Sequence, residues 1–122
     1  MGQLLETRLK RLSAPEMAGL VRGGQRGVER ECLRVTPDGQ LARTPHPQTL
    51  GSALTNEYIT TDYSEALLEF VTPPQLTNWE TIQFLCDVHQ FVMERIGDEL
   101  LWSLSMPCSI SGDADVPLAR YG

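Results

Sequence analysis

Two glutamates, Glu29 and Glu31, lie in a segment that reads as extended, and their spacing makes them candidates for cation binding. On a strand, residues two apart share a face, so both carboxylates point the same way as Leu33 and Val35. Two acids side by side next to an apolar stripe repel each other and lose hydration. A hard cation such as Mg²⁺, which prefers carboxylate oxygens, would relieve both penalties. The alternative is an edge strand with a polar end.

A third glutamate, Glu69, interrupts the apolar run ALLEFV of residues 66–71. On a strand its neighbours on the same face are Leu67 and Val71. A lone carboxylate there is costly unless it is paired, protonated or bound to a cation. A salt bridge to an arginine and a place in a metal site are both open. Asp62 ends the preceding extended segment, where an aspartate is either a turn residue or a further ligand.

The remaining reactive side chains give weaker signals. His89 falls on the apolar face of a predicted helix, which favours a packed, hydrogen-bonded imidazole. The glycine-rich run of residues 23–27 precedes a strand and does not join a strand to a helix, so it is not a nucleotide-binding loop of either common type. The three cysteines form no CxxC pair, which argues against a zinc site and favours reduced thiols. Three arginines four residues apart would share a strand face and could pair with carboxylates or meet an anion: Arg26, Arg30 and Arg34.

Helices and short strands are predicted to position these residues. The spacing of leucines predicts a helix over residues 4–12, and Ser13 with Glu16 predicts the capped start of a second short helix. Three segments read as strands, although the third also fits a helical pattern: residues 27–35, 58–62 and 66–72. A turn at residues 36–39 would return residues 40–42 as a hairpin partner.

The clearest element is a long helix that begins with a capping box of Thr77 and Glu80 and ends at Gly97. We predict that one apolar face of this helix packs on the sheet, formed by Trp79, Ile82, Leu85, Cys86, His89, Val92, Met93 and Ile96. The expected architecture is α+β, with mostly antiparallel strands that carry the acids and one long helix on a face.

Length and charge limit the possible functions. The chain has 122 residues, a net charge of −6 and 41% hydrophobic residues, as is typical of a globular protein. Residues 1–34 are basic on balance and residues 35–122 are acidic. An acidic body repels nucleic acid and anionic lipid, so we expect neither as a partner. No apolar run approaches the roughly 20 residues of a membrane span, and the start lacks the features of a signal peptide, so we expect a cytoplasmic protein.

A series of motifs resembles a known family. The run RGVERECLRV of residues 26–35, followed by Asp38-Gly39, resembles the opening of the proteobacterial type of glutamate–cysteine ligase. The likeness covers residues 22–122 and leaves the first 21 residues unplaced. It continues in order through further blocks: His46-Pro47, LGSALT at 50–55, ITTD at 59–62, EALLEF at 65–70, Thr72-Pro73, GDE at 97–99, LSMPC at 104–108 and Tyr121-Gly122.

This resemblance implies a fold similar to that of the glutamine-synthetase-like carboxylate–amine ligases. It implies an enzyme that joins the γ-carboxyl group of glutamate to cysteine through γ-glutamyl phosphate, driven by ATP, as the first step of glutathione biosynthesis. The substrates would be the small molecules glutamate, cysteine and ATP. It also implies two or three Mg²⁺ ions held by Glu29, Glu31 and Glu69, with Asp62 near the metal or the cysteine amine.

Members of this family run to several hundred residues. Residues 1–122 are therefore expected to form the N-terminal part of one larger catalytic domain, and to be inactive alone. Two alternatives remain open. One is a non-catalytic Mg²⁺-binding or interaction module, and the other is a related ligase that joins glutamate to a different amine.

Overall fold

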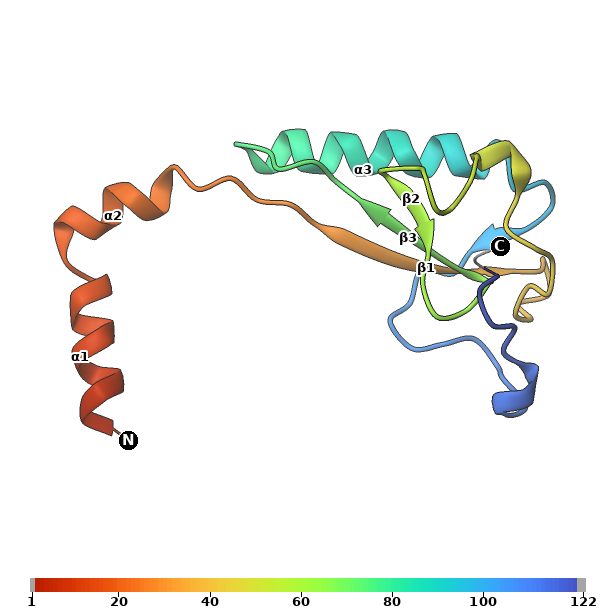
Figure 1. Cartoon of the computed structure of the whole chain (residues 1–122), viewed down its shortest axis with the longest axis horizontal. Coiled ribbons are helices and arrows are strands. Elements are labelled where there is room, and N and C mark those ends of the chain that lie inside the picture. The colour runs from red at the N-terminus through yellow and green to blue at the C-terminus, as the bar shows by residue number, and fades with distance from the viewer. Residues whose placement is uncertain (1, 121–122) are drawn as a thin grey trace.

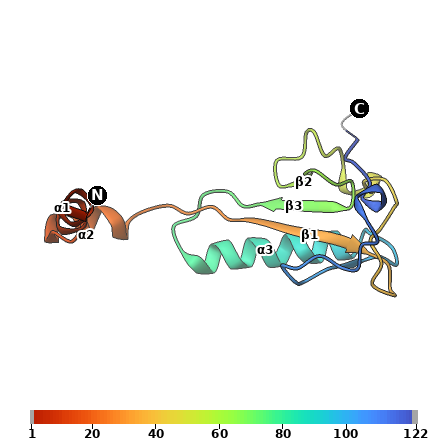
Figure 2. The same cartoon turned by 90° about the horizontal axis from the view of Figure 1, so that it is seen from below.

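A four-stranded antiparallel sheet, with one long helix on one of its faces, forms the body of the protein (Figures 1 and 2). The computed structural model describes residues 2–120, apart from the side chain of Val21. The strand order is β2-β3-β1-β4, with β1 at Glu29–Val35, β2 at Ile59–Thr61, β3 at Leu67–Val71 and β4 at Leu100–Leu101. Two 3-10 turns lie at Gln48–Leu50 and Asp113–Asp115. The predicted α+β architecture is confirmed.

Alternation of side chains decides the conformation of β3, where the sequence allowed either a strand or a helix. Leu68 and Phe70 are fully buried, whereas the residues on either side of them are half-buried. This period of two is that of a strand with one face in the core. β3 pairs with β1 and β2, and Glu31 lies directly opposite Glu69.

The strand β1 contributes to two hydrophobic clusters, one on each face of the sheet. Cys32 packs with β2, β3 and the long helix on one face. Val35 and the half-buried Leu33 pack on the other face against loop residues Leu41, Ala66 and Cys108, among others. The acids of β1 share the second face, so the acidic part of that face continues directly into a packed apolar part.

The long helix α3 (Asn78–Met93) begins as predicted. Thr77 is its N-cap and forms a reciprocal capping box with Glu80. The predicted end at Gly97 is wrong: the helix ends at Met93 with Glu94 as its C-cap, and Gly97, with a positive φ of 67°, lies in the turn that follows. The prediction of its packing face is wrong in part. Trp79, Ile82 and Met93 are 72%, 53% and 59% exposed. The inward face is instead formed by Thr81, Leu85, Val88, Val92 and, beyond the helix, Ile96.

The N-terminal arm consists of α1 (Gly2–Leu12) and α2 (Pro15–Arg22) and extends away from the sheet (Figure 1). No residue of α1 is buried. The hydroxyl of Ser13 donates to the carbonyl of Leu9, and α2 begins at Pro15. The predicted cap at Ser13 is therefore corrected: the side chain closes α1, and proline supplies the preformed first turn of α2.

The predicted hairpin after β1 is present in a reduced form. Gly39 takes a positive φ of 80° in the turn, and its N–H donates to the carbonyl of Thr36. Beyond it, Leu41 pairs with Val35 as an isolated bridge, and the N–H of Ala42 donates to the carbonyl of Arg34.

Among residues 2–120, no helix is long and apolar enough to cross a membrane.

Candidate functional site

The acidic residues singled out by the sequence come together on the face of the sheet opposite α3. Glu29 and Glu31 are exposed on β1, and Glu69 is half-buried on β3. Glu31 and Glu69 are cross-strand partners, and Thr60 of β2 lies opposite Glu69 on its other side. Asp62 follows the last residue of β2 and is exposed. Three strands thus bring carboxylates from distant parts of the sequence onto one surface, which we call the acidic face (Glu29, Glu31, Asp62 and Glu69).

Glu69 lies in surroundings that disfavour its ionised form. Burial raises the pKa of Glu69 above its ordinary value of 4.5, and the charges of Glu29, Asp62 and Glu31 raise it further. In the described residues, no lysine, arginine or histidine forms an ion pair with Glu69. The alternative of a salt bridge is therefore wrong for this residue. Among residues 2–120, Glu69 thus has like charges beside it and no ion-pair partner, and a bound cation would supply the missing positive charge.

The arginines predicted to share a strand face are engaged elsewhere. Arg34 is fully buried and pairs with Glu99 at 2.6 Å. Arg26 donates to the side chain of Asn78 at the start of α3. Arg30 donates from Nε to the imidazole of His89 at 3.2 Å. All three stay off the acidic face.

The donor set of the acidic face fits a hard cation, although its side chains are not gathered into a closed ligand set. Among the described residues, no three His, Cys, Asp or Glu groups are close enough to hold a metal ion as they stand. Carboxylates on neighbouring strands start from Cβ positions about 5 Å apart, so rotamer changes alone bring their oxygens together. Oxygen ligands without nitrogen or sulfur suit Mg²⁺ or Ca²⁺.

Beside the acidic face, a hollow of about 790 Å³ lies along the first part of β1, before the residues that pair with β4. Glu29 and Glu31 border it from one side and Arg30 from the other. The loop containing Met106 and Pro107 forms its outer wall. An anionic or zwitterionic molecule in this hollow would meet both the guanidinium and any cation held by the carboxylates.

His89 fixes the position of Arg30. Its Nδ1 contacts the carbonyl of Leu85 at 2.7 Å and its Nε2 faces Arg30 Nε. Both ring nitrogens therefore have hydrogen-bond partners, the carbonyl of Leu85 and the guanidinium of Arg30. The ring also packs edge-on against Phe70. The prediction of a packed, hydrogen-bonded histidine is confirmed, and its role is to hold an arginine at the hollow.

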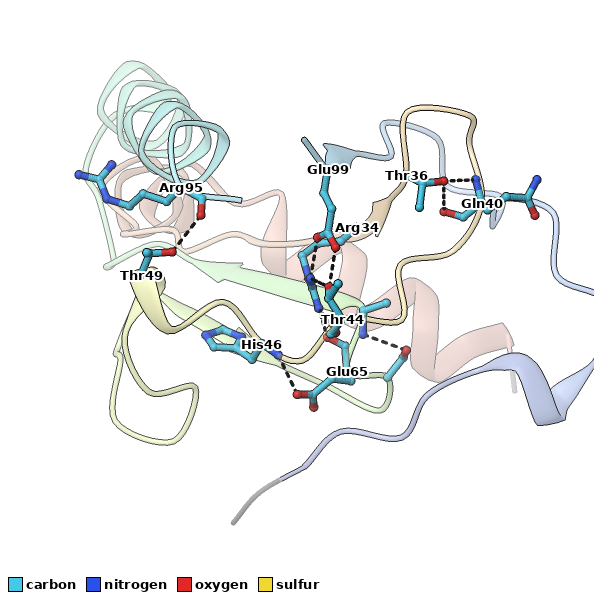
Figure 3. Close-up of polar contacts among 11 residues, drawn as sticks. Arg34, Thr36, Gln40, Thr44, His46, Thr49, Glu65, Arg95 and Glu99 are labelled. Atoms are coloured by element: carbon cyan, nitrogen blue, oxygen red, sulfur yellow. Dashed lines mark hydrogen bonds and ion pairs between the residues drawn. The ribbon is translucent and has the colours of Figure 1, made fainter. Parts of the chain in front are cut away.

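A buried polar cluster, which the sequence did not reveal, supports the far end of β1 (Figure 3). Arg34 donates to Glu99, to the side chain and carbonyl of Thr44, and to the carbonyl of Glu65. The Glu65 carboxylate accepts the backbone N–H groups of His46 and Arg120. Burial opposes ionisation of Glu65, but these two N–H groups outweigh it and lower its pKa.

These contacts tie four separate segments to one strand end. Glu65 lies only four residues before Glu69, so the cluster fixes the start of the strand that carries the site. The only local signal for this cluster was the block EALLEF, which contains two glutamates in different surroundings. Glu65 is 5% exposed, and both of its carboxylate oxygens accept hydrogen bonds. Glu69 faces the other acids.

The fold is shared with solved ligases and synthetases. The glutamate–cysteine ligase of Francisella tularensis, solved in complex with AMP, superposes with a TM-score of 0.78 at 42% sequence identity, over 82% of this chain and 20% of that chain. A bifunctional glutathione synthetase from Pasteurella multocida superposes with a TM-score of 0.79 at 33% identity, over 86% of this chain and 14% of that one. The fold therefore defines the class of glutamate–cysteine ligases and glutathione synthetases.

Within this class, the chain belongs to the glutamate–cysteine ligase family, whose model matches residues 9–122. The glutamate–cysteine ligase of Alcanivorax borkumensis is 56% identical over 118 residues, which cover 97% of this chain and 22% of the relative. That of Pseudomonas putida strain W619 is 53% identical over 122 residues, which cover 100% of this chain and 23% of the relative. The chain thus spans less than a quarter of the length of these relatives. The predicted family membership is confirmed.

Proposed function

We propose that this chain forms the cation-binding wall of a glutamate–cysteine ligase. The carrying observation is the acidic face, where Glu69 lies opposite Glu31 and, among residues 2–120, forms no ion pair with a base, in a chain of this family. Glu29, Glu31 and Glu69 are the proposed ligands of Mg²⁺, two or three ions in all, and ATP is the proposed co-substrate. Residues 1–122 would be the first part of one larger catalytic domain.

The proposed reaction has two steps. A γ-carboxylate oxygen of glutamate attacks the γ-phosphorus of ATP, and ADP leaves. The amine of cysteine then attacks the acyl carbon of γ-glutamyl phosphate, phosphate leaves, and the nitrogen loses a proton. Mg²⁺ bound at the acidic face would neutralise the phosphate oxygens.

The residues of this chain would mainly orient and neutralise. Arg30, held by His89, offers a fixed positive charge at the edge of the hollow to a substrate carboxylate or phosphate. Asp62, at the end of β2 and close enough to raise the pKa of Glu69, is the proposed contact of the incoming amine. No enzyme nucleophile is required, because the phosphate leaving group already activates the acyl carbon.

The test uses a chimera in which this chain replaces the matching part of the A. borkumensis ligase. Glu31→Gln and Glu69→Gln should each raise the Mg²⁺ concentration for half-maximal rate by roughly tenfold or more, since even a residue that only orients a metal ligand is worth that much. Asp87→Asn, on the exposed side of α3, is the matched control and should leave this value unchanged. An unaltered Mg²⁺ dependence in both glutamate variants would refute the assignment.

The chain alone is expected to be inactive as a ligase. ATP-dependent formation of γ-glutamylcysteine by the isolated 122 residues would contradict this. The relatives are glutamate–cysteine ligases, which favours cysteine as the acceptor, and a panel of amines offered to the chimera tests that choice. If the isolated chain is folded and monomeric and binds Mg²⁺, but the chimera has no ligase activity, the result would instead support a non-catalytic module.

A further inference from the structure

The outward side of α3 carries an apolar stripe that the described residues leave uncovered. It consists of Trp79, Ile82, Cys86 and Met93, which recur at helical spacing along the exposed side; we call it the outer stripe. A shallow apolar depression lies along it. The inward side of α3 already packs in the core through Val92 and its neighbours. The outer stripe is therefore a second packing surface on the same helix.

The outer stripe lies apart from the proposed chemistry. α3 covers one face of the sheet (Figure 2). Alternation along β1 and β3 places the acidic carboxylates on the other face. An apolar depression also has little to offer charged substrates such as amino acids and nucleotides. A contiguous exposed apolar patch of this kind marks a protein contact.

Its size argues against a second copy of this chain as the occupant. A helix of 16 residues is about 24 Å long, and a stripe along it offers a few hundred Å², whereas a stable dimer buries roughly 800 Å² on each partner. The relatives, by contrast, carry more than three quarters of their length outside the matched region. Within one polypeptide a small surface is sufficient, because the packing partner is already attached.

Charge beside the outer stripe describes the occupant further. Glu80, Asp87 and Glu94 recur every seven residues beside the stripe. Glu80 also caps the helix and Glu94 also pairs with Arg95, which leaves Asp87 as the acid of the three that neither caps the helix nor pairs with a base among residues 2–120. Residues seven apart lie on the same side of a helix. A segment that packs here with matching charge is apolar at its centre and carries lysine or arginine along that side.

We propose that the outer stripe is an internal packing surface of a longer ligase, covered by an apolar, basic-flanked segment from the part of the polypeptide that relatives carry outside the matched region. This inference rests on family membership and does not depend on the proposed metal site. Activity is therefore not the readout of its test.

Cys86 is a built-in probe of coverage. It is the exposed cysteine of the chain, whereas Cys32 and Cys108 are 2% and 5% exposed. A maleimide should modify Cys86 rapidly in the isolated chain and at least tenfold more slowly in the chimera, with the modified peptide identified by mass spectrometry. Equal rates would overturn the proposal. The same rate can be measured in the A. borkumensis ligase after a cysteine is placed at the position aligned with Cys86. That protein avoids the artificial joint between two sequences that the chimera contains.

The other occupants are distinguished in the isolated chain. If a second copy covers the stripe, modification of Cys86 slows as the chain concentration rises. If the N-terminal arm covers it, deletion of residues 2–22 accelerates the modification. Either result would overturn the proposed occupant, and a rate independent of both changes supports it.

A charge placed in the outer stripe distinguishes a stripe that is covered by another segment from one that is exposed to solvent. Ile82→Asp should lower the melting temperature of the chimera by several degrees, because it buries a charge, but should not lower that of the isolated chain. Gln83→Asp adds the same charge at the next position, outside the stripe; because it also loses the hydrogen bond to Asp87 and adds a like charge one turn from Glu80 and Asp87, it should cost the same small amount in both proteins. An Ile82→Asp chimera as stable as its parent would contradict the proposal.

Discussion

Replacing Glu69 by glutamine should stabilise the isolated chain at neutral pH. Glu69 is half-buried on β3, directly opposite Glu31, and its pKa is raised by burial and by three neighbouring acids. Glutamine keeps the size of the side chain and its capacity for hydrogen bonds but removes the charge. The substitution therefore removes repulsion and desolvation cost without opening a cavity.

The expected magnitude follows from the number of like charges. A like-charged cross-strand neighbour costs roughly 0.2–1 kcal/mol, and screening at exposed partners favours the lower half of that range. Three neighbours, Glu29, Asp62 and Glu31, then give about 1 kcal/mol. For a domain of this size this is a rise in melting temperature of about 4 °C.

The dependence on pH gives the sign of the effect. An acid whose pKa is raised in the folded state makes folding less favourable as pH rises from the ordinary value near 4.5 through the raised value. Wild-type chain and variant should therefore be equally stable below that window and diverge above it. Thermal unfolding followed by circular dichroism from pH 4 to pH 8 measures the divergence.

Added Mg²⁺ provides the complementary measurement. If the acidic face binds the cation, Mg²⁺ at about ten times its dissociation constant stabilises the wild-type chain by about 1.4 kcal/mol, and Glu69→Gln should lose most of this gain. A variant that is less stable than wild type at pH 7 would refute the repulsion. An equal response of both proteins to Mg²⁺ would refute the participation of Glu69 in cation binding.

Three further substitutions test the supporting structure. Thr77→Ala removes the N-cap of α3 and should cost about 1 kcal/mol of unfolding free energy, measured by urea denaturation; no change would show that tertiary contacts alone hold the first turn. Glu99→Ala leaves the fully buried guanidinium of Arg34 without its 2.6 Å partner and should cost about 3 kcal/mol of unfolding free energy. Asp115→Ala in the exposed pair with Arg43 should cost less than about 1 kcal/mol. Similar losses in both variants would contradict a larger contribution from the buried pair. Glu65→Gln loses two charge-assisted hydrogen bonds and should cost about 2 kcal/mol at pH 7. Because the pKa of Glu65 is lowered in the folded state, wild type should lose stability as pH falls below about 4.5, and the glutamine variant should lose less of it over the same range.

Local patterns were sufficient for most of the elements and for the face that carries the acids, although they left β3 open between strand and helix and did not predict β4. The capping box at Thr77 and Glu80 correctly marked the start of α3, because capping involves only neighbouring residues. The two-residue period placed Glu29 and Glu31 on one face of β1. The motif series also identified the family. The assignment of Glu29, Glu31 and Glu69 as metal ligands stays a prediction, as does the role of Asp62.

The packing face of α3 could not be obtained in this way. Its inward residues and its outer stripe lie about 120° apart around the helix, and both are apolar at helical spacing. The pattern therefore merged Val92, which is fully buried, with Trp79 and Met93, which are not. Only the position of the sheet distinguishes the two sides.

Tertiary structure also decided which charges meet. Sequence spacing allowed Arg34 to pair with the acids of the site, but pairing of β1 with β4 brings Glu99 to it. The register of β1 on β3 places Glu31 opposite Glu69 and leaves both without a basic partner among the described residues. Residue types thus supplied the carboxylates and their common face, while strand register, which is fixed by burial of Leu68 and Phe70, brought them together on the acidic face.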